Sequence, residues 1–169
     1  MPKLEILAPA GSMEALEAAV RCGADAVYLA GKNFGMRAAS GNFDREEMIA
    51  AVYYCHKHGV KLYVTLNVMP HTHEYEELRG YIKFLDAIGV DAVIVADIGV
   101  LMTVREVAPK MEIHISTQTS AVSAAACRII SLSIGLMVAI LITLAEIPSS
   151  SSINAALSAI STVIPLAIM

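Results

Sequence analysis

Two histidines and a carboxylate lie close together in the segment Met69–Glu74. Imidazole nitrogens and carboxylate oxygens are ligands of zinc and iron, so His71, His73 and Glu74 are candidates for the metal site of a hydrolase. The segment is also typical of a surface loop that enters a helix, with Glu74 stabilised by the positive end of that helix. Because no further ligand follows at short range, we assign no metal ligands and keep the metal-dependent hydrolase as an alternative function.

Two loops contain groups that suit an anion. The segment Gly31–Arg37 carries Lys32 and Arg37, whose cations can bind a carboxylate or a phosphate. The segment Ala8–Ser12 is a turn of small residues, and its backbone N–H groups can bind an anion at the start of a helix. Both loops are equally compatible with plain solvated turns.

The three cysteines, Cys22, Cys55 and Cys127, are widely spaced and form no Cys-x-x-Cys pair. This spacing argues against a local metal–thiolate site and against a disulfide framework, and it favours a reducing compartment. We expect all three to be small core residues. Spacing alone indicates no Ser/His/Asp arrangement for nucleophilic catalysis.

The elements that must position these groups alternate regularly. Short runs rich in β-forming residues predict five strands, at Leu4–Ala8, Ala26–Ala30, Lys61–Asn67, Ala92–Ala96 and Glu112–Thr117. Segments with helical periodicity lie between them. Ser12 is suited to begin the first helix, and Asp44 with Glu47 predicts a capping box for the second. Tyr75–Leu85 carries one apolar stripe, and Val100–Val107 is a fourth helix that ends before Pro109.

A glycine precedes several of these strands in the same context. The segments Cys22–Val27 and Ile88–Val93 are near-copies, and Gly59 occupies the equivalent place before the third strand. Glycine accepts the left-handed conformation that ends a helix, so the repeated unit is a helix, a glycine cap and a strand. Such units predict an α/β fold with a parallel sheet. The even repeat favours an incomplete (β/α) TIM-type barrel of about five parallel strands over an open doubly wound sheet.

Alternation along the strands predicts which side chains face the barrel interior. Helices should cover the aliphatic set, such as Ile113 and Ile115. The polar set should then point inward, and its last members should lie at the carboxyl ends of the strands, which we call the barrel mouth. Enzymes with this architecture keep their chemistry there. By position, the candidate site residues are Asn67, Asp97, Ser116 and Gln118, although polar barrel layers can also serve only to hydrogen-bond one another.

Composition bounds the class of protein and divides the chain in two. Of 169 residues, 56% are hydrophobic and the formal net charge is −4, which excludes wholesale disorder and shows no basic stripe for nucleic acid. Every Lys and Arg, and every acid except Glu146, lies in residues 1–128. We therefore expect an N-terminal βα-repeat half-barrel over residues 1–128 and an aberrant apolar, Ser-rich C-terminal tail over residues 129–169.

The tail has three interpretations. Residues 129–145 and 153–169 are uncharged and long enough for a membrane hairpin. The abrupt change of composition favours an out-of-frame or misjoined end, because real sequences agree across levels of structure. A third interpretation is that the tail replaces barrel strands.

Several motifs occur in collinear order and carry a family resemblance. They are Leu7–Ser12, Gly23–Tyr28, Phe34–Arg37 with Asn42 and Phe43, Asn67 with Pro70 and His71, Asp97–Gly99, and His114–Gln118. Over residues 1 to about 128 the chain resembles the N-terminal part of the collagenase-like peptidase U32 family, and looks closest to its tRNA-hydroxylation branch. The resemblance implies a bacterial or archaeal cytoplasmic protein with a barrel-like N-terminal domain.

The resemblance also implies an activity and partners. Family members are named as collagenase-type peptidases or are implied in oxygen-independent hydroxylation of a tRNA uridine, an rRNA cytidine or a ubiquinone precursor, with prephenate as a hydroxyl source for tRNA. The hydroxylating members carry a four-Cys 4Fe–4S cluster. In this interpretation the mouth is lined by Arg37, Asn67, His71, Ser116 and Gln118. Arg37 holds the carboxylate of prephenate, and Ser116 and Gln118 hydrogen-bond it. The catalytic candidates are Asn67, His71, Ser116 and Gln118, and the substrate-binding candidates are Arg37 and Asp97. A peptide is the alternative substrate.

The family pattern stops after Arg128, and the cluster cysteines and three barrel strands do not follow. We therefore expect a truncated family member that holds no cofactor and is inactive alone, which leaves open whether the chain itself is an enzyme. Two functions of a different class stay open beside this one. They are the metal-dependent hydrolase and a non-enzymatic remnant anchored to a membrane by the tail.

Overall fold

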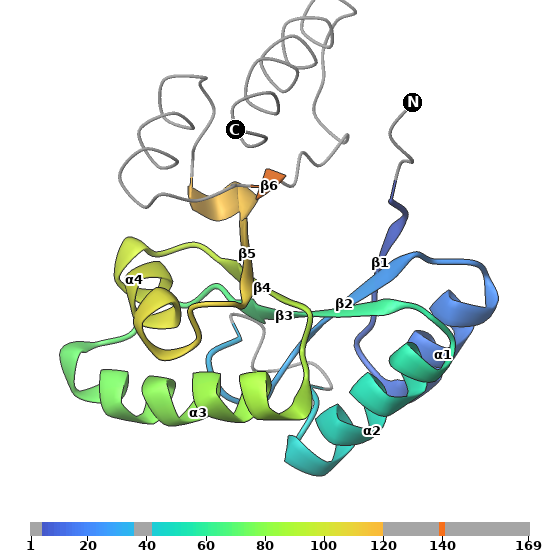
Figure 1. The fold of residues 1–169 in the computed structure, drawn as a ribbon, viewed down its shortest axis with the longest axis horizontal. Helices are drawn as coiled ribbons and strands as arrows, with labels where there is room; N and C mark the ends of the chain where they lie inside the picture. The colour runs from blue at the N-terminus through green and yellow to red at the C-terminus, as the bar shows by residue number, and fades with distance from the viewer. Residues whose placement is uncertain (1–4, 36–41, 120–138, 141–169) are drawn as a thin grey trace, which may run out of the picture.

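The computed structural model describes residues 5–35, 42–119 and 139–140. Strands and helices alternate along the chain, and all strands run parallel in one sheet (Figure 1). The elements are β1 (Leu7–Pro9), α1 (Met13–Arg21), β2 (Ala26–Ala30), α2 (Arg45–Lys57), β3 (Lys61–Leu66), η1 (Thr72–Glu74), α3 (Tyr75–Ile88), β4 (Ala92–Val95), α4 (Ile98–Val107), β5 (Glu112–Ile115), η2 (Thr117–Thr119) and β6 (Ala139–Ile140).

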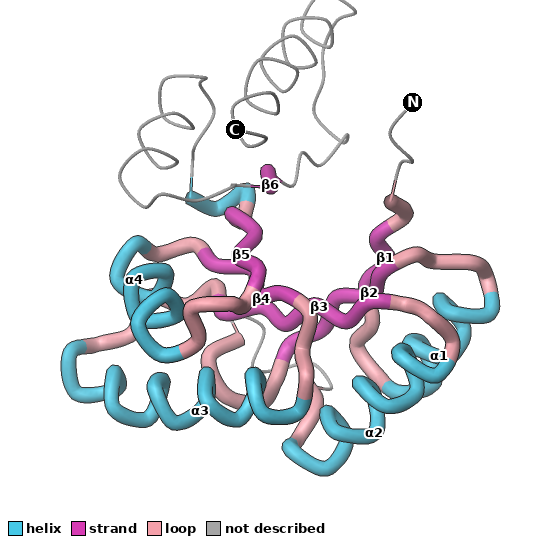
Figure 2. Tube along the Cα trace, in the orientation of Figure 1, coloured by secondary structure: helices cyan, strands magenta, loops and turns pink. Residues whose placement is uncertain are grey.

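The order of the strands is that of a barrel. Hydrogen-bonded neighbours follow the order of the chain from β1 to β6. Helices α1, α2, α3 and α4 lie side by side along one face of the curved sheet (Figure 2). A doubly wound sheet would reverse its strand order and carry helices on both faces. Sequential order with helices outside is the arrangement of a (β/α) barrel, so the barrel prediction is confirmed for these strands.

Local sequence signals set the helix ends. The Ser12 hydroxyl accepts from the Ala15 N–H at 3.2 Å, and Asp44 and Glu47 form the reciprocal capping box. Gly89 ends α3 with a φ of 83°, a conformation that costs a residue with a Cβ more than glycine. These caps agree with the sequence predictions.

The near-copied segments before β2 and β4 share a function in pairing. The carboxylate of Asp25 accepts from the Ile6 N–H at 3.0 Å, and that of Asp91 accepts from the Leu62 N–H at 2.8 Å. Each aspartate therefore ties the start of its own strand to the preceding strand. The repeated sequence therefore corresponds to a repeated aspartate hydrogen bond between neighbouring strands.

The two faces of the sheet bury different side chains. Ile113, Ile115 and Leu62 belong to the large cluster that packs against the helices. Tyr63 and Ile94 belong to a smaller cluster on the opposite, barrel-interior face. The predicted alternation is confirmed, because the aliphatic members of β3 and β5 meet the helices.

Several predicted boundaries are corrected, and β3 and β4 each end one residue earlier than predicted, at Leu66 and Val95. β1 covers Leu7–Pro9 rather than Leu4–Ala8, and the outward-facing Ile6 is 62% exposed because β1 lies at the edge of the sheet. α4 begins at Ile98 because Asp97 caps it, two residues before the predicted start. β5 ends at Ile115, where the chain turns into η2.

The predicted tail, residues 129–169, lies outside the described residues except for β6. That short strand pairs in parallel with β5, with Ala139 beside His114. Within the part of the chain that the structure describes, no helix is long and apolar enough to cross a bilayer.

Candidate functional site

The register of β3, β4 and β5 brings three residues to the same edge. Leu66 pairs with Val95, and Val95 pairs with Ile115, so the residues that follow these three lie in line at the carboxyl ends. They are Asn67, Ala96 and Ser116. The Ser116 N–H donates to the Val95 carbonyl at 2.8 Å, which extends the β4–β5 pairing to the mouth.

A hydrogen-bonded group of neutral polar side chains forms at this edge. The Asn67 amide donates to Gln118 Oε1 at 2.9 Å, although the two residues are 51 positions apart. The Gln118 N–H donates to the Ser116 hydroxyl at 3.3 Å. Ser116 is buried, Asn67 is half-buried and Gln118 is exposed, so the group leads from the barrel interior to solvent. Amides and a hydroxyl can orient a polar or anionic ligand without adding charge.

Asp97 has a structural partner at the start of α4. Its Oδ1 accepts from the Val100 N–H at 3.0 Å, which is the N-cap interaction, and from the Tyr75 hydroxyl at 3.4 Å. Burial, and then the neighbouring Asp97 carboxylate, raise the pKa of Tyr75. Asp97 lies one residue before the observed start of α4, and an aspartate at that position is the sequence signal that indicates a capping role. Its predicted contact with substrate stays a prediction.

The loop that contains His71 is exposed, and the contacts of His71 are with residues of the same loop. The His71 N–H donates to Glu74 Oε2 at 2.6 Å, and the rings of His71 and His73 are nearly parallel with centroids 5.8 Å apart. The described residues contain no group of three or more His, Cys, Asp or Glu side chains that could hold a metal. The metal-dependent hydrolase stays a prediction.

The described parts of the two predicted anion loops make contacts within the protein. In the loop after β2, Lys32 Nζ lies 3.1 Å from Asp44 Oδ2, and the Asn33 amide donates to Glu77 at 3.1 Å. Arg37, the predicted carboxylate-binding residue, lies outside the described residues. In the turn Ala8–Ser12, the Ser12 side chain caps α1.

The sequence predicts only part of a polar network that lies at the amino ends of the strands. Alternation placed Tyr63 and His114 on the interior face, but not their partners. The Tyr63 hydroxyl donates to Glu5 Oε1 at 2.7 Å, and Lys61 Nζ lies 3.0 Å from Glu5 Oε2. The edge of the His114 ring contacts Tyr63, with centroids 4.6 Å apart, and its Nε2 lies 2.9 Å from Glu112.

Electrostatics in this network favours a charged Glu5 and a neutral Tyr63. Burial acts to raise the pKa of the Glu5 carboxyl, but hydrogen bonds from Tyr63 and Lys61 outweigh it and hold that pKa below its ordinary value. Burial, and then the hydrogen bond to Glu5, raise the pKa of the Tyr63 phenol strongly. The amino end of a barrel is the end concerned with stability, so we assign this network to folding.

The cysteines do not fit the 4Fe–4S cluster that the family resemblance implies. A Cys₄ cluster needs four thiolates, and the sequence has three cysteines. Among the described residues, Cys55 is buried in α2 as predicted, but the prediction that Cys22 is a core residue is wrong, because Cys22 is exposed at the end of α1. Burial, and then the Asp91 charge, raise the pKa of the Cys55 thiol to about 11, which is unfavourable for a thiolate ligand.

Comparison with known proteins gives consistent matches. The profile of Peptidase family U32 matches residues 11–141. The chain is 44% identical over 118 residues to tRNA hydroxylation protein P1 of Bacillus subtilis, covering 70% of this chain and 28% of that protein. It is 39% identical to the 23S rRNA 5-hydroxycytidine C2501 synthase of Escherichia coli, covering 69% of this chain and 17% of that protein. The chain thus spans less than a third of these relatives.

A solved structure shows the same fold. The U32 peptidase Mk0906 superposes with a TM-score of 0.52 and 17% sequence identity, covering 73% of this chain and 50% of that chain. At that identity the likeness concerns the arrangement of strands and helices alone.

Proposed function

Because the chain belongs to peptidase family U32, we propose that it supplies the barrel mouth of an RNA-hydroxylating protein. In this proposal the mouth binds an unpaired nucleotide of tRNA or rRNA together with a small carboxylate such as prephenate. The observation that carries the proposal is the 44% identity to tRNA hydroxylation protein P1, over a length that includes most of the described strands. The proposal places the chain in the cytoplasm, where tRNA is modified.

The side chains at the mouth have complementary tasks in this proposal. Asn67 and Gln118, held together at 2.9 Å, present amide groups that hydrogen-bond the edge of a nucleobase. The hydroxyl of the buried Ser116 hydrogen-bonds the small carboxylate and orients it from the barrel interior. Arg37, from the loop after β2, neutralises that carboxylate.

The proposal assigns these residues binding and orientation only. Three cysteines do not satisfy a Cys₄ cluster, so no step of the reaction is derived through iron and sulfur. We expect the isolated chain to bind RNA but not to hydroxylate it.

A chimera tests the proposal. Residues 1–119 replace the matching segment of tRNA hydroxylation protein P1 in a Bacillus subtilis strain that lacks this protein, and hydroxylated uridine in tRNA is measured by mass spectrometry. We expect the chimera to restore the modified nucleoside. Arg37→Ala should abolish it, and Gln118→Ala should reduce its rate about fivefold to tenfold, because one hydrogen bond is worth about 1 kcal/mol.

The matched control is Lys110→Ala, which removes an exposed cation from the loop before β5. It should leave the modified nucleoside unchanged. A chimera that restores modification fully with both Arg37→Ala and Gln118→Ala would refute the assigned roles.

A further inference from the structure

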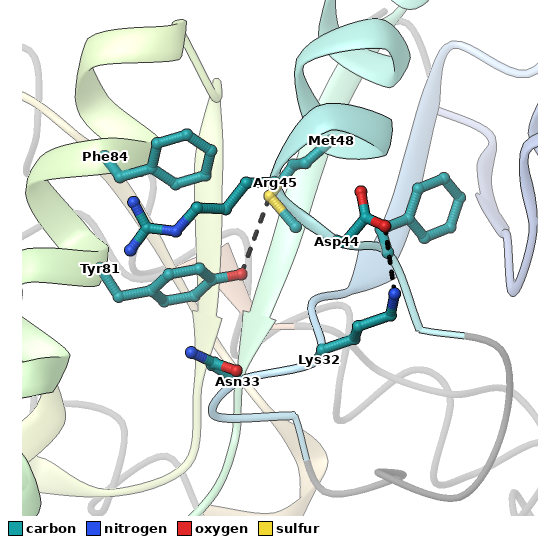
Figure 3. Close-up of a pocket in the computed structure, with 8 residues that line it drawn as sticks. Lys32, Asn33, Asp44, Arg45, Met48, Tyr81 and Phe84 are labelled. Carbon is teal, nitrogen blue, oxygen red and sulfur yellow. Dashed lines mark hydrogen bonds and ion pairs between the residues drawn. The ribbon is translucent and has the colours of Figure 1, made fainter.

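A pocket distinct from the mouth lies between the β2–α2 loop and the helices α2 and α3. Its volume is about 190 Å³. Figure 3 shows its lining, which comes from Lys32, Asn33, Phe43, Asp44, Arg45, Met48, Tyr81 and Phe84. No residue assigned above to the mouth is among them. Because β2 delivers Lys32 at its carboxyl end, the pocket opens at the same end of the sheet as the mouth.

Aromatic side chains from α3 form one wall. The rings of Tyr81 and Phe84 are stacked with centroids 6.1 Å apart, and Arg45 reaches from α2 toward them (Figure 3). The Arg45 guanidinium lies 4.7 Å from the centre of the Phe84 ring. This wall offers aromatic rings with a planar guanidinium over one of them, and both kinds of group stack on nucleobases.

A buried hydroxyl lies at the base of the pocket with a weak partner. Tyr81 is 4% exposed, and its hydroxyl donates to the Met48 sulfur at 3.7 Å. A thioether is a poor acceptor, so this hydroxyl retains capacity for a stronger hydrogen bond. Gly31 permits the approach, because a Cβ there would collide with the Tyr81 hydroxyl.

The charges around the opening favour an anion. Lys32 and Arg45 are both exposed, and the single lining acid, Asp44, caps α2 and forms an ion pair with Lys32. The lining residues therefore carry a net positive charge. Flat rings, a buried hydroxyl and two cations together match the base and the phosphate of one nucleotide.

We propose that this pocket binds a nucleotide of single-stranded RNA next to the one held at the mouth, with the base on Phe84 and its phosphate between Lys32 and Arg45. The inference rests on the proposed function, since it concerns the same RNA. The pocket is smaller than the roughly 300–1,000 Å³ typical of drug-sized ligands, which suits a single base rather than a larger group. RNA that passes from the mouth along the carboxyl ends of β3 and β2 would reach it.

Binding of RNA by the purified full-length chain tests the inference. The probe is a short fluorescein-labelled oligouridylate, and its affinity is measured by anisotropy over a range of salt concentrations. Phe84→Leu should weaken binding by about fivefold or more, because stacking contributes on the order of 1–3 kcal/mol per base. Combining Lys32→Ala with Arg45→Gln should weaken binding and reduce the slope of log K against log salt by about 0.7, because one phosphate contact is lost.

Matched controls remove the same residue types elsewhere on the surface. Arg21→Gln and Lys110→Ala remove exposed cations from α1 and from the loop before β5, and they should leave affinity and salt slope unchanged. Thermal unfolding of each variant excludes loss of the fold. Because Arg45 and Lys32 are exposed, their substitution keeps the test valid even if Phe84→Leu is destabilising.

Two results would overturn the inference. One is an unchanged affinity and slope in folded Lys32→Ala/Arg45→Gln. The other is that benzoate, a small aromatic acid, binds at this pocket while no pocket variant changes the affinity for RNA. In either case the chimera experiment still decides the proposed function, because it measures hydroxylation through Arg37 and Gln118.

Discussion

Removal of the Tyr63 hydroxyl should destabilise the fold and change its dependence on pH. Tyr63 is 1% exposed, and its hydroxyl donates to Glu5 at 2.7 Å. A hydrogen bond to a charged group contributes about 1.5–3 kcal/mol. Glu5 retains Lys61, and its side chain is 37% exposed, so water replaces part of the lost contact. We therefore expect Tyr63→Phe to lower the free energy of unfolding by about 1 kcal/mol at pH 7.

The sign of the pH effect follows from Glu5. Its folded pKa is lowered, so its contribution is complete above its unfolded pKa of about 4.3 and is lost as pH falls through the folded value. The difference between the natural protein and Tyr63→Phe should accordingly be largest near neutral pH and shrink in acid.

Urea unfolding followed by circular dichroism, at neutral pH and at intervals into the acid range, measures this difference. Tyr53→Phe is the control, because Tyr53 is 69% exposed on α2 and its change should stay within about 0.5 kcal/mol. A Tyr63→Phe protein as stable as this control, or a difference that stays constant with pH, would refute the reasoning.

Three further changes test other parts of the structure. Asp97→Ala should lower stability by about 1 kcal/mol through loss of the α4 cap, whereas Asp97→Asn should retain most of it; equal losses in urea unfolding would contradict the capping role. Iodoacetamide at pH 8 should modify exposed Cys22 and spare Cys55, whose pKa is raised to about 11, as peptide mass spectrometry would show. Gly31→Ala should cost about 1–3 kcal/mol by collision with the Tyr81 hydroxyl, and Tyr81→Phe should partly rescue it in a double-mutant cycle.

Features encoded within a few residues were predictable from the sequence. The caps at Ser12 and Asp44 depend on partners three residues away, and the alternation of β3 and β5 depends only on the two-residue period of a strand. The mouth was predictable for a related reason, because parallel strands in sequential order bring Asn67 and Ser116 to one edge.

Features that depend on contacts between distant residues were not predictable. Glu5 and Tyr63 are 58 positions apart, and the second pocket combines the β2–α2 loop with the middle of α3. Alternation indicates which face a side chain occupies, but not which partner its polar atoms reach. The start of α4 at Ile98 depends on the N-cap interaction of Asp97, whereas the apolar pattern alone indicates a start at Val100.

The sequential strand order has a consequence for local opening of the fold. Among the described residues, each strand pairs only with its neighbours along the chain, so the backbone amides at the centre of the sheet are enclosed by pairing on both sides, and those of β1 on one side. Backbone amides exchange with deuterated solvent through local unfolding, which begins where protecting neighbours are fewest. Deuterium uptake should therefore be slower in β3 than in β1, because the sheet opens more readily at its first strand than at its centre.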